Sequence, residues 1–281
     1  MVLSAFEQFV NLEISEWNKE KTIVAFPAQE VTLNFGGTLH GGASMSIINM
    51  AAKHVLSALI SEQEQGEIRT LDQSVRFTST ARGEKVLAEA VVIKKGKELA
   101  FVDVDVKTED GKVVSKGLVT LRYGQVNEDK KERTAAKISL EDYYPHEWHP
   151  GPMAQLLAQR GFTANLGLNI QHVKNSKSVV RIDANKNILN NAGVIDDGVI
   201  ATLCDSAGAM ASMAMNEQAM SRGSTPSLHI NYFSALENES LVALATGRWS
   251  YNESYVADVS VVGENSGTLY AEAQVLFRIV G

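Results

Sequence analysis

The amino-acid sequence predicts an α+β fold built from two copies of one structural unit, each a long central helix wrapped by a curved antiparallel sheet. Two observations predict this fold. The segment that starts at Gly37 recurs from Gly193 onward, an offset of 156 residues, and each copy holds an apolar, helix-length run followed by alternating strands. The 281 residues, 44% of them hydrophobic and 21% charged, are enough to bury a sizeable core.

The repeat is clearest where each apolar run begins. Residues 34–42, NFGGTLHGG, lie over residues 190–198, NNAGVIDDG, and further along Asn49 lies over Asp205. After the helix the offset becomes 155, which aligns SVRF with HINY, and similar strands follow in both copies. Because agreement over so long a stretch is not expected by chance, the sequence indicates an internal duplication.

Each copy predicts the same order of elements: an opening strand, a loop, a long helix and strands joined by tight turns. The opening strands are expected at 21–28 and 178–185, and the helices at Gly42–Leu59 and Gly198–Asn216. Both helices are apolar nearly all round, so they must be covered on most sides. The later strands of the first copy are expected at 71–78, 86–94, 100–108 and 113–123, and the turns EDGK and ENSG match between the copies.

A charged segment separates the two copies. Residues 125–141 read QVNEDKKERTAAKISLE, a composition typical of a linker. The sequence therefore predicts a first unit over residues 1–124, a linker over 125–144 and a second unit over 145–281.

The composition argues against several classes of protein. A net charge of −7 without a basic stripe argues against nucleic-acid binding, and an acidic N-terminus without a basic n-region argues against a signal peptide. The longest nearly uncharged stretch, 198–216, contains Asp205 and fits a buried helix better than a membrane span. A single cysteine excludes a disulfide framework, and His146-x-x-His149 lacks the companions of a metal site. We expect a cytoplasmic protein with no metal and no bound cofactor.

Several residues of the two copies together resemble a known family. The first copy has Asn34, then the run His40-Gly41-Gly42 and a small-residue helix; the second has Asp205, and Thr225 followed by LHINYF. These residues resemble the hotdog superfamily, in particular its phenylacetyl-CoA-type and related acyl-CoA thioesterases. The resemblance covers nearly the whole chain, once per copy, although neither copy has the complete pattern. It implies a tandem double hotdog, in which two units that normally form a dimer are fused and packed around a pseudo-twofold axis.

The start of the first long helix offers groups suited to thioester chemistry. The first turn of a helix has unpaired N–H groups and a partial positive charge, and glycines there let a ligand oxygen approach the backbone. The N–H groups of Gly41 and Gly42 are therefore predicted to hold the oxyanion formed when a thioester carbonyl is attacked. His40 and Asn34 are expected to order the loop or to hold the carbonyl. Asp205 is expected to attack the carbonyl or to deprotonate a water.

Each site is predicted to combine both copies. Asp205 lies two helical turns, about 10 Å, beyond the start of its own helix and cannot reach a carbonyl held there. Two antiparallel helices related by a twofold axis place each helix start beside the middle of the other helix. One site is then expected to contain Asn34, His40, Gly41, Gly42, Asp205 and, from the resemblance, Thr225. A degenerate second site is expected to contain Asn190, Asp196, Asp197, Gly198, Asn49 and Thr70.

Other residues have a functional and a structural interpretation. Arg222 is expected to contact the phosphates of coenzyme A. Met210 and Met213 are candidates for a pliable acyl pocket, with core packing as the alternative. Cys204 aligns with an isoleucine in the first copy, so it is expected to fill the core and not to act as a nucleophile.

The predicted function is hydrolysis of an acyl-CoA thioester at one composite site. A non-catalytic acyl-CoA binder on the same fold is one alternative, because fold does not determine function. A hydratase or dehydratase is another, although His-Gly-Gly with a distant Asp fits hydrolysis better. The expected partners are a small-molecule acyl-CoA and a second double-hotdog chain in a homodimer, with no nucleic acid and no membrane.

Overall fold

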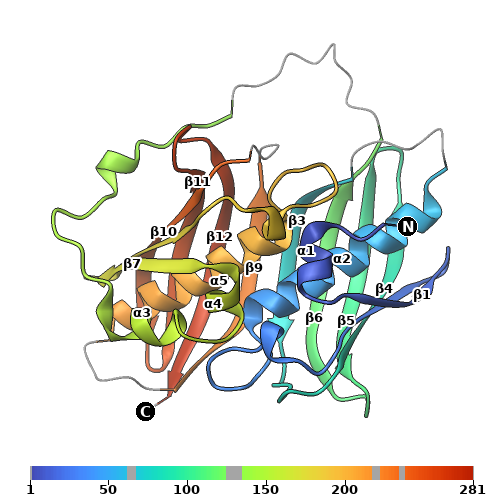
Figure 1. Cartoon of the computed structure of the whole chain (residues 1–281), viewed down its shortest axis with the longest axis horizontal. Helices are drawn as coiled ribbons and strands as arrows, with labels where there is room; N and C mark the ends of the chain where they lie inside the picture. Colours follow the sequence, from blue (N-terminus) through green and yellow to red (C-terminus); the bar gives the residue numbers. More distant parts are fainter. Residues whose placement is uncertain (1, 62–67, 125–134, 217–221, 234–237, 281) are drawn as a thin grey trace.

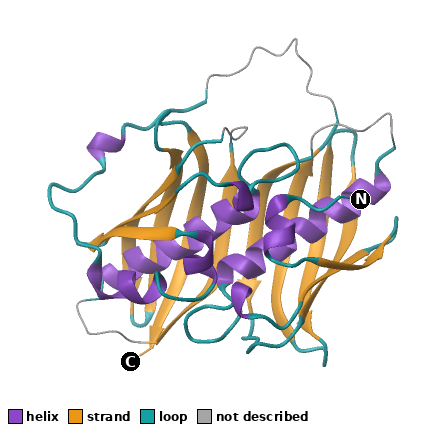
Figure 2. Ribbon diagram, viewed as in Figure 1, coloured by secondary structure: helices purple, strands orange, loops and turns teal. Residues whose placement is uncertain are grey.

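One broad sheet carries the whole molecule. The computed structural model describes residues 2–61, 68–124, 135–216, 222–233 and 238–280. Within these ranges, twelve strands form one antiparallel sheet, and the long helices α2 (Gly41–Leu59) and α5 (Asp197–Ala214) lie against the same face of it (Figure 1). Figure 2 shows the same arrangement as a layer of helices in front of a layer of strands. This architecture confirms the predicted α+β fold of two similar units.

The elements of the first half recur in the same order in the second half, which begins with two additional short helices. The first half contains α1 (Ala5–Phe9), β1 (Glu13–Trp17), β2 (Thr22–Phe26), η1 (Glu30–Thr32), α2, β3 (Arg69–Phe77), β4 (Val86–Lys95), β5 (Leu99–Thr108) and β6 (Val113–Arg122). The second half contains η3 (Leu140–Asp142), α3 (Gly151–Leu157), α4 (Phe162–Leu166), β7 (Leu168–Lys174), β8 (Lys177–Ile182), η4 (Lys186–Ile188), α5, β9 (Arg222–Tyr232), β10 (Leu241–Tyr251), β11 (Ser254–Gly263) and β12 (Leu269–Val280).

The two halves meet at the centre of the sheet. The strand order β1-β2-β4-β5-β6-β3 continues as β9-β12-β11-β10-β8-β7, so the second half mirrors the first. At the junction, β3 pairs with β9 and Ser74 lies directly opposite His229, its own counterpart in the repeat. Their side chains are hydrogen-bonded at 2.6 Å between Oγ and Nδ1. The pseudo-twofold axis therefore passes between these two residues.

The long helices cross in opposite directions at their first turns. A Cβ on Gly42 would lie 2.6 Å from the Cα of Thr202, and a Cβ on Gly198 would lie 2.6 Å from the Oγ of Ser46. These two contacts are counterparts in the repeat, as a twofold axis requires. The second glycine is therefore present in both copies because the helices approach each other too closely there for any larger residue.

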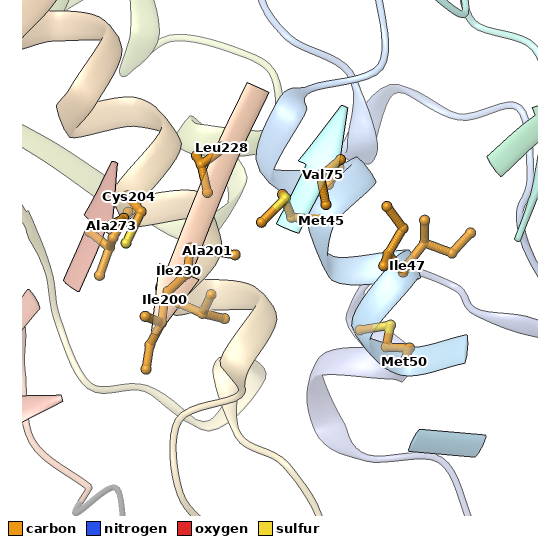
Figure 3. Packing of buried hydrophobic residues seen from close by; sticks show 14 of the residues in the cluster. Met45, Ile47, Met50, Val75, Ile200, Ala201, Cys204, Leu228, Ile230 and Ala273 are labelled. Atoms are coloured by element: carbon orange, nitrogen blue, oxygen red, sulfur yellow. The ribbon is translucent and has the colours of Figure 1, made fainter. Parts of the chain in front are cut away.

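Apolar side chains fill the space between helices and sheet. Along the strands, buried and more exposed residues alternate, as in β5, so one face of the sheet packs on the helices. Met45 and Val75 belong to this buried cluster, as does Cys204, which is fully buried on α5 (Figure 3). The prediction that Cys204 fills the core is confirmed.

The short helices α1 and α4 also correspond to each other, so the repeat begins earlier in each copy than the sequence alone indicates. The N–H of Phe6 in α1 donates to the carbonyl of Leu189 at 3.1 Å, and the N–H of Phe162 in α4 donates to the carbonyl of Leu33 at 2.7 Å. Each short helix thus packs on the loop that precedes the long helix of the other copy. Both long helices begin one residue earlier than predicted, and α5 ends two residues earlier.

Part of the predicted linker packs on the sheet. Residues 125–134 lie outside the described residues, but Lys137 pairs with Thr268 next to β12. Ile138 and Tyr144 pack against a second apolar cluster that includes Val242 of β10. Since the neighbouring residues of β10 belong to the main core, this cluster lies on the face of the sheet away from the helices.

Candidate active site

Asn34 orders the loop that leads into α2. Its Oδ1 accepts hydrogen bonds from the N–H groups of Gly36 at 2.9 Å and Thr38 at 3.1 Å, and its Nδ2 donates to the Thr38 hydroxyl at 2.7 Å. Asn190 accepts the corresponding two backbone bonds in the second copy. Because the asparagine does the same work in both copies, these contacts favour loop ordering over a role in holding the carbonyl.

His40 caps the start of α2. Its Nδ1 accepts the N–H of Gly42 at 2.9 Å, so the proton of the neutral ring lies on Nε2. Burial lowers the pKa of His40, and the neighbouring Asp205 carboxylate only partly opposes this effect. The ring packs on Phe162 of α4, with 5.6 Å between ring centroids. His40 is therefore a neutral ring, and Nε2 makes no hydrogen bond with another described residue.

Asp205 reaches the start of α2 from the second copy. Its Oδ2 accepts the N–H of Gly42 at 3.1 Å, and its Oδ1 accepts the hydroxyl of Thr225 at 2.7 Å. The side chain is 8% exposed, and Nδ1 of His40 lies 3.6 Å from Oδ2. Since this nitrogen accepts the Gly42 N–H, no proton lies between it and the carboxylate. The structure thus brings together Asp205, Thr225 and the His40–Gly42 turn across the two copies.

Gly41 lies directly against the carboxylate. A Cβ at this position would be 2.5 Å from Oδ2 of Asp205 and 3.0 Å from its Cγ, so any larger residue would displace the carboxylate. The Gly41 N–H has no hydrogen-bond partner among the described residues, whereas the Gly42 N–H is bound to both His40 and Asp205. The expectation that both N–H groups hold an oxyanion is therefore wrong for Gly42, because its N–H donates to the capping ring of His40 and to Asp205.

An ion pair fills the second site. Lys53 Nζ lies 2.6 Å from Oδ2 of Asp197, the residue that corresponds to Gly41. The Thr70 hydroxyl donates to the same oxygen at 2.7 Å, and the Asn49 amide donates to the Thr70 hydroxyl at 2.9 Å. Burial lowers the pKa of Lys53, but the charges of Asp197 and Asp196 outweigh this and raise it. Asp197, which the sequence assigns to a degenerate second site, therefore has a cation as its partner.

Asp196 is the helix cap of the second copy. Its carboxylate accepts the N–H of Gly198 at 2.8 Å, as the His40 ring does for Gly42. Burial raises the pKa of Asp196 to about 6, although the charge of Lys53 opposes the shift. The predicted degenerate site is therefore a buried cluster of two carboxylates, one ammonium and two neutral polar groups.

The predicted substrate-binding residues are less closely tied to this site. Arg222 is exposed at the start of β9. Met210 is 4% exposed and belongs to the main core, and Met213 packs against that core, which favours the packing interpretation. Burial raises the pKa of the Cys204 thiol far above its usual range, so the thiol is unsuited to attack.

Sequence reasoning missed two residues of these sites. Lys53 is a charged residue in the middle of an apolar helix, and its counterpart 156 residues later is Ala209. A lysine at such a position needs a partner, and this is the signal that could have found it. Phe162, which packs on His40, corresponds to Phe6 at the same offset. Extending the repeat toward the N-terminus could have found this pair.

The described residues show neither a metal-binding cluster nor a membrane-spanning helix. In the part of the chain that the structure describes, no group of three or more His, Cys, Asp or Glu side chains is placed to hold a metal ion. No helix of the described residues is long and apolar enough to cross a membrane.

Fold and site together define a duplicated hotdog protein with a composite helix-start site. The family model of the Thioesterase superfamily matches residues 36–115, which include α2. Mouse acyl-coenzyme A thioesterase 13 is 30% identical over 107 residues, 37% of this chain and 74% of the mouse protein, and the human protein of that name is 30% identical over 106 residues, 37% and 74% of the two chains. The chain belongs to the Thioesterase superfamily.

Solved structures show that the tandem fold spans the whole chain. The tesB protein of Mycobacterium avium subsp. paratuberculosis is 9% identical, with a TM-score of 0.67 over 96% of both chains. A hot dog fold protein from Alicyclobacillus acidocaldarius is 13% identical, with a TM-score of 0.67 over 100% of this chain and 99% of that chain. These similarities confirm the predicted double hotdog.

Proposed function

We propose that this protein hydrolyses acyl-CoA thioesters at the site formed by the start of α2 and Asp205. The observation that carries this proposal is the position of the carboxylate: Oδ2 lies against Gly41 and 3.1 Å from the Gly42 N–H, with no ion pair to a lysine or arginine among the described residues. The similarity to a protein named acyl-coenzyme A thioesterase 13 supports coenzyme A as the thiol part of the substrate.

The geometry suits attack on a thioester carbonyl. In this proposal the oxygen of a bound carbonyl accepts the free Gly41 N–H, and the Nε2–H of His40 is the candidate second donor for the developing oxyanion. The hydroxyl of Thr225 and the N–H of Gly42 hold the two oxygens of Asp205 in place. Asp205 attacks the carbonyl carbon or takes a proton from the water that does so. The C–S bond then breaks, the thiol leaves with a proton, and water supplies the hydroxyl of the acid.

Only one of the two helix-start sites is proposed to work. At the second site, Asp197 carries a carboxylate where the first site has Gly41, and Lys53 neutralises its charge at 2.6 Å. Asn49, an amide, stands where Asp205 provides a carboxylate. The second site thus lacks both a glycine over which a carbonyl oxygen can reach the backbone N–H and a carboxylate without a cationic partner.

The test is thiol release from a panel of short, long and aromatic acyl-CoA substrates. We expect Asp205→Asn to abolish release, because the amide can neither attack nor accept a proton. Asn49→Ala is the matched control at the counterpart position and is expected to leave release nearly intact, with folding checked by thermal melting. Equal loss in both variants would refute the single-site proposal. Tight acyl-CoA binding by the wild-type protein without any release would identify a non-catalytic binder instead.

A further inference from the structure

A surface groove lies beside the loop that leads into α2. Its volume is about 500 Å³, within the range of small-molecule sites. One wall is the loop Leu33–Gly37, and the others come from Ala28–Glu30, Gly83 and Arg160. None of these residues takes part in the chemistry proposed above apart from Asn34, which orders the loop.

The groove is directly connected to the catalytic turn. The N–H of His40 donates to the carbonyl of Thr32 at 3.0 Å, and Leu33 pairs with Leu39 as an isolated bridge. The wall of the groove therefore runs antiparallel to the residues that enter α2. The groove wall and the catalytic turn therefore belong to one loop, residues 33–40, held together by backbone hydrogen bonds.

Arg160 places a positive charge at the groove. The next residue, Gly161, must be glycine for two reasons. Its φ is +89°, and an added Cβ would lie 2.8 Å from the carbonyl oxygen of Leu33. The N–H of Phe162 then donates to that same carbonyl at 2.7 Å. The chain on both sides of Gly161 is thus fixed against the loop. The guanidinium is exposed and makes no ion pair or hydrogen bond with another described residue.

The second copy uses the corresponding positions differently. Ser4, 156 residues before Arg160, caps α1 by accepting the N–H of Glu7 at 3.1 Å. Asn191, the counterpart of Phe35 in the groove wall, donates to the carbonyl of Val2 at 3.1 Å. The N-terminal segment therefore contacts the loop of the second site, which begins at Asn190. At the first site, the guanidinium of Arg160 borders the corresponding loop instead.

We propose that this groove binds the phosphate-bearing nucleotide half of coenzyme A and that Arg160 contacts its phosphates. The inference rests on the proposed function and adds a residue that distinguishes coenzyme A thioesters from thioesters of smaller thiols. Guanidinium groups bind phosphate oxygens through paired hydrogen bonds. The flexible pantetheine arm separates the thioester from the phosphates, so the cation belongs at a distance from Asp205. Glu30 lies in the same groove and weakens the attraction.

The experiment compares two substrates that carry the same acyl group. Acyl-CoA has the phosphates, and the acyl-pantetheine thioester lacks them. We expect Arg160→Gln to raise KM for acyl-CoA about 10-fold, the effect of losing one charge-assisted contact, with kcat and the KM for acyl-pantetheine unchanged. Glu30→Gln is expected to lower KM for acyl-CoA. Added salt should weaken the preference of the wild-type protein for acyl-CoA, because the contact is exposed.

Arg222→Gln tests the alternative phosphate contact that the sequence indicates, at an arginine that is also exposed. An unchanged acyl-CoA to acyl-pantetheine ratio in Arg160→Gln, or a change in Arg222→Gln alone, would overturn the proposal. Calorimetric titration with free coenzyme A and with pantetheine gives a readout that does not need turnover. If no thioester is hydrolysed, the proposed function fails. Even then, weaker binding of coenzyme A by Arg160→Gln would support the groove as the coenzyme A site, and unchanged binding would reject it.

Discussion

The two glycines at the start of α2 have different roles, so replacing each with alanine should separate activity from stability. In Gly41→Ala the new Cβ would lie 2.5 Å from Oδ2 of Asp205, roughly 1 Å closer than ordinary van der Waals contact. The carboxylate must therefore move by about that distance. Its hydrogen bonds to Thr225 and Gly42, at 2.7 and 3.1 Å, lengthen or break as it moves.

A displacement of about 1 Å in a reacting group can reduce a rate by about 100-fold. We therefore expect Gly41→Ala to lower kcat for thioester hydrolysis by about 100-fold. We expect it to lower the free energy of unfolding less than Gly42→Ala does, because no backbone atom is in the way. The assay is thiol release under saturating acyl-CoA, paired with urea unfolding.

Gly42→Ala is the matched comparison. Its Cβ would lie 2.6 Å from the Cα of Thr202, a backbone atom of α5, so the two helices must separate. We expect this variant to unfold at a clearly lower urea concentration. If Gly41→Ala hydrolysed acyl-CoA at close to the wild-type rate, the assignment of Gly41 and Asp205 as neighbours at the reacting centre would be refuted.

Two further predictions concern the closed second site. Lys53→Met should destabilise the protein by about 1–3 kcal/mol, because it leaves the 15% exposed carboxylate of Asp197 without its cation. The double variant Lys53→Met with Asp197→Gly should recover most of this loss. Thiol release should stay unchanged in both variants, and a fall in kcat would contradict a purely structural role for the pair. For Asp196, burial raises the pKa from 3.8 to about 6. The folded state therefore holds the proton more tightly than the unfolded state, and this residue lowers stability as pH rises from about 4 to about 6. Asp196→Asn keeps a good cap and should gain up to about 3 kcal/mol relative to wild type between those pH values; equal differences in unfolding free energy at pH 4 and pH 7.5 would show that the carboxyl is not the cause.

The sequence predicted the parts of the site that follow from periodicity and from the repeat. The long helices were placed to within two residues, because apolar runs of helical length between glycine-rich loops and alternating strands have few other solutions. The pairing of Asp205 with the start of α2 followed from the reach of a helical turn combined with twofold geometry.

Other features depend on contacts that no local pattern records. Strand β1 was missed because it lies at the sheet edge without a fully buried face, so its hydrophobic alternation is weak. The use of the Gly42 N–H by both His40 and Asp205 depends on the geometry of one helical turn. The pairing of Lys53 with Asp197 joins residues on different copies, and neither neighbourhood in the sequence points to the other.

The junction between β3 and β9 lies within a single polypeptide, as do Gly41 and Asp205. When a site is shared between separate chains, it is lost on dilution below the dissociation constant of the pair. Here the covalent connection keeps the two partners at a high effective concentration whatever the amount of protein. Specific activity should therefore stay constant down to concentrations at which a pair of unlinked hotdog chains would come apart.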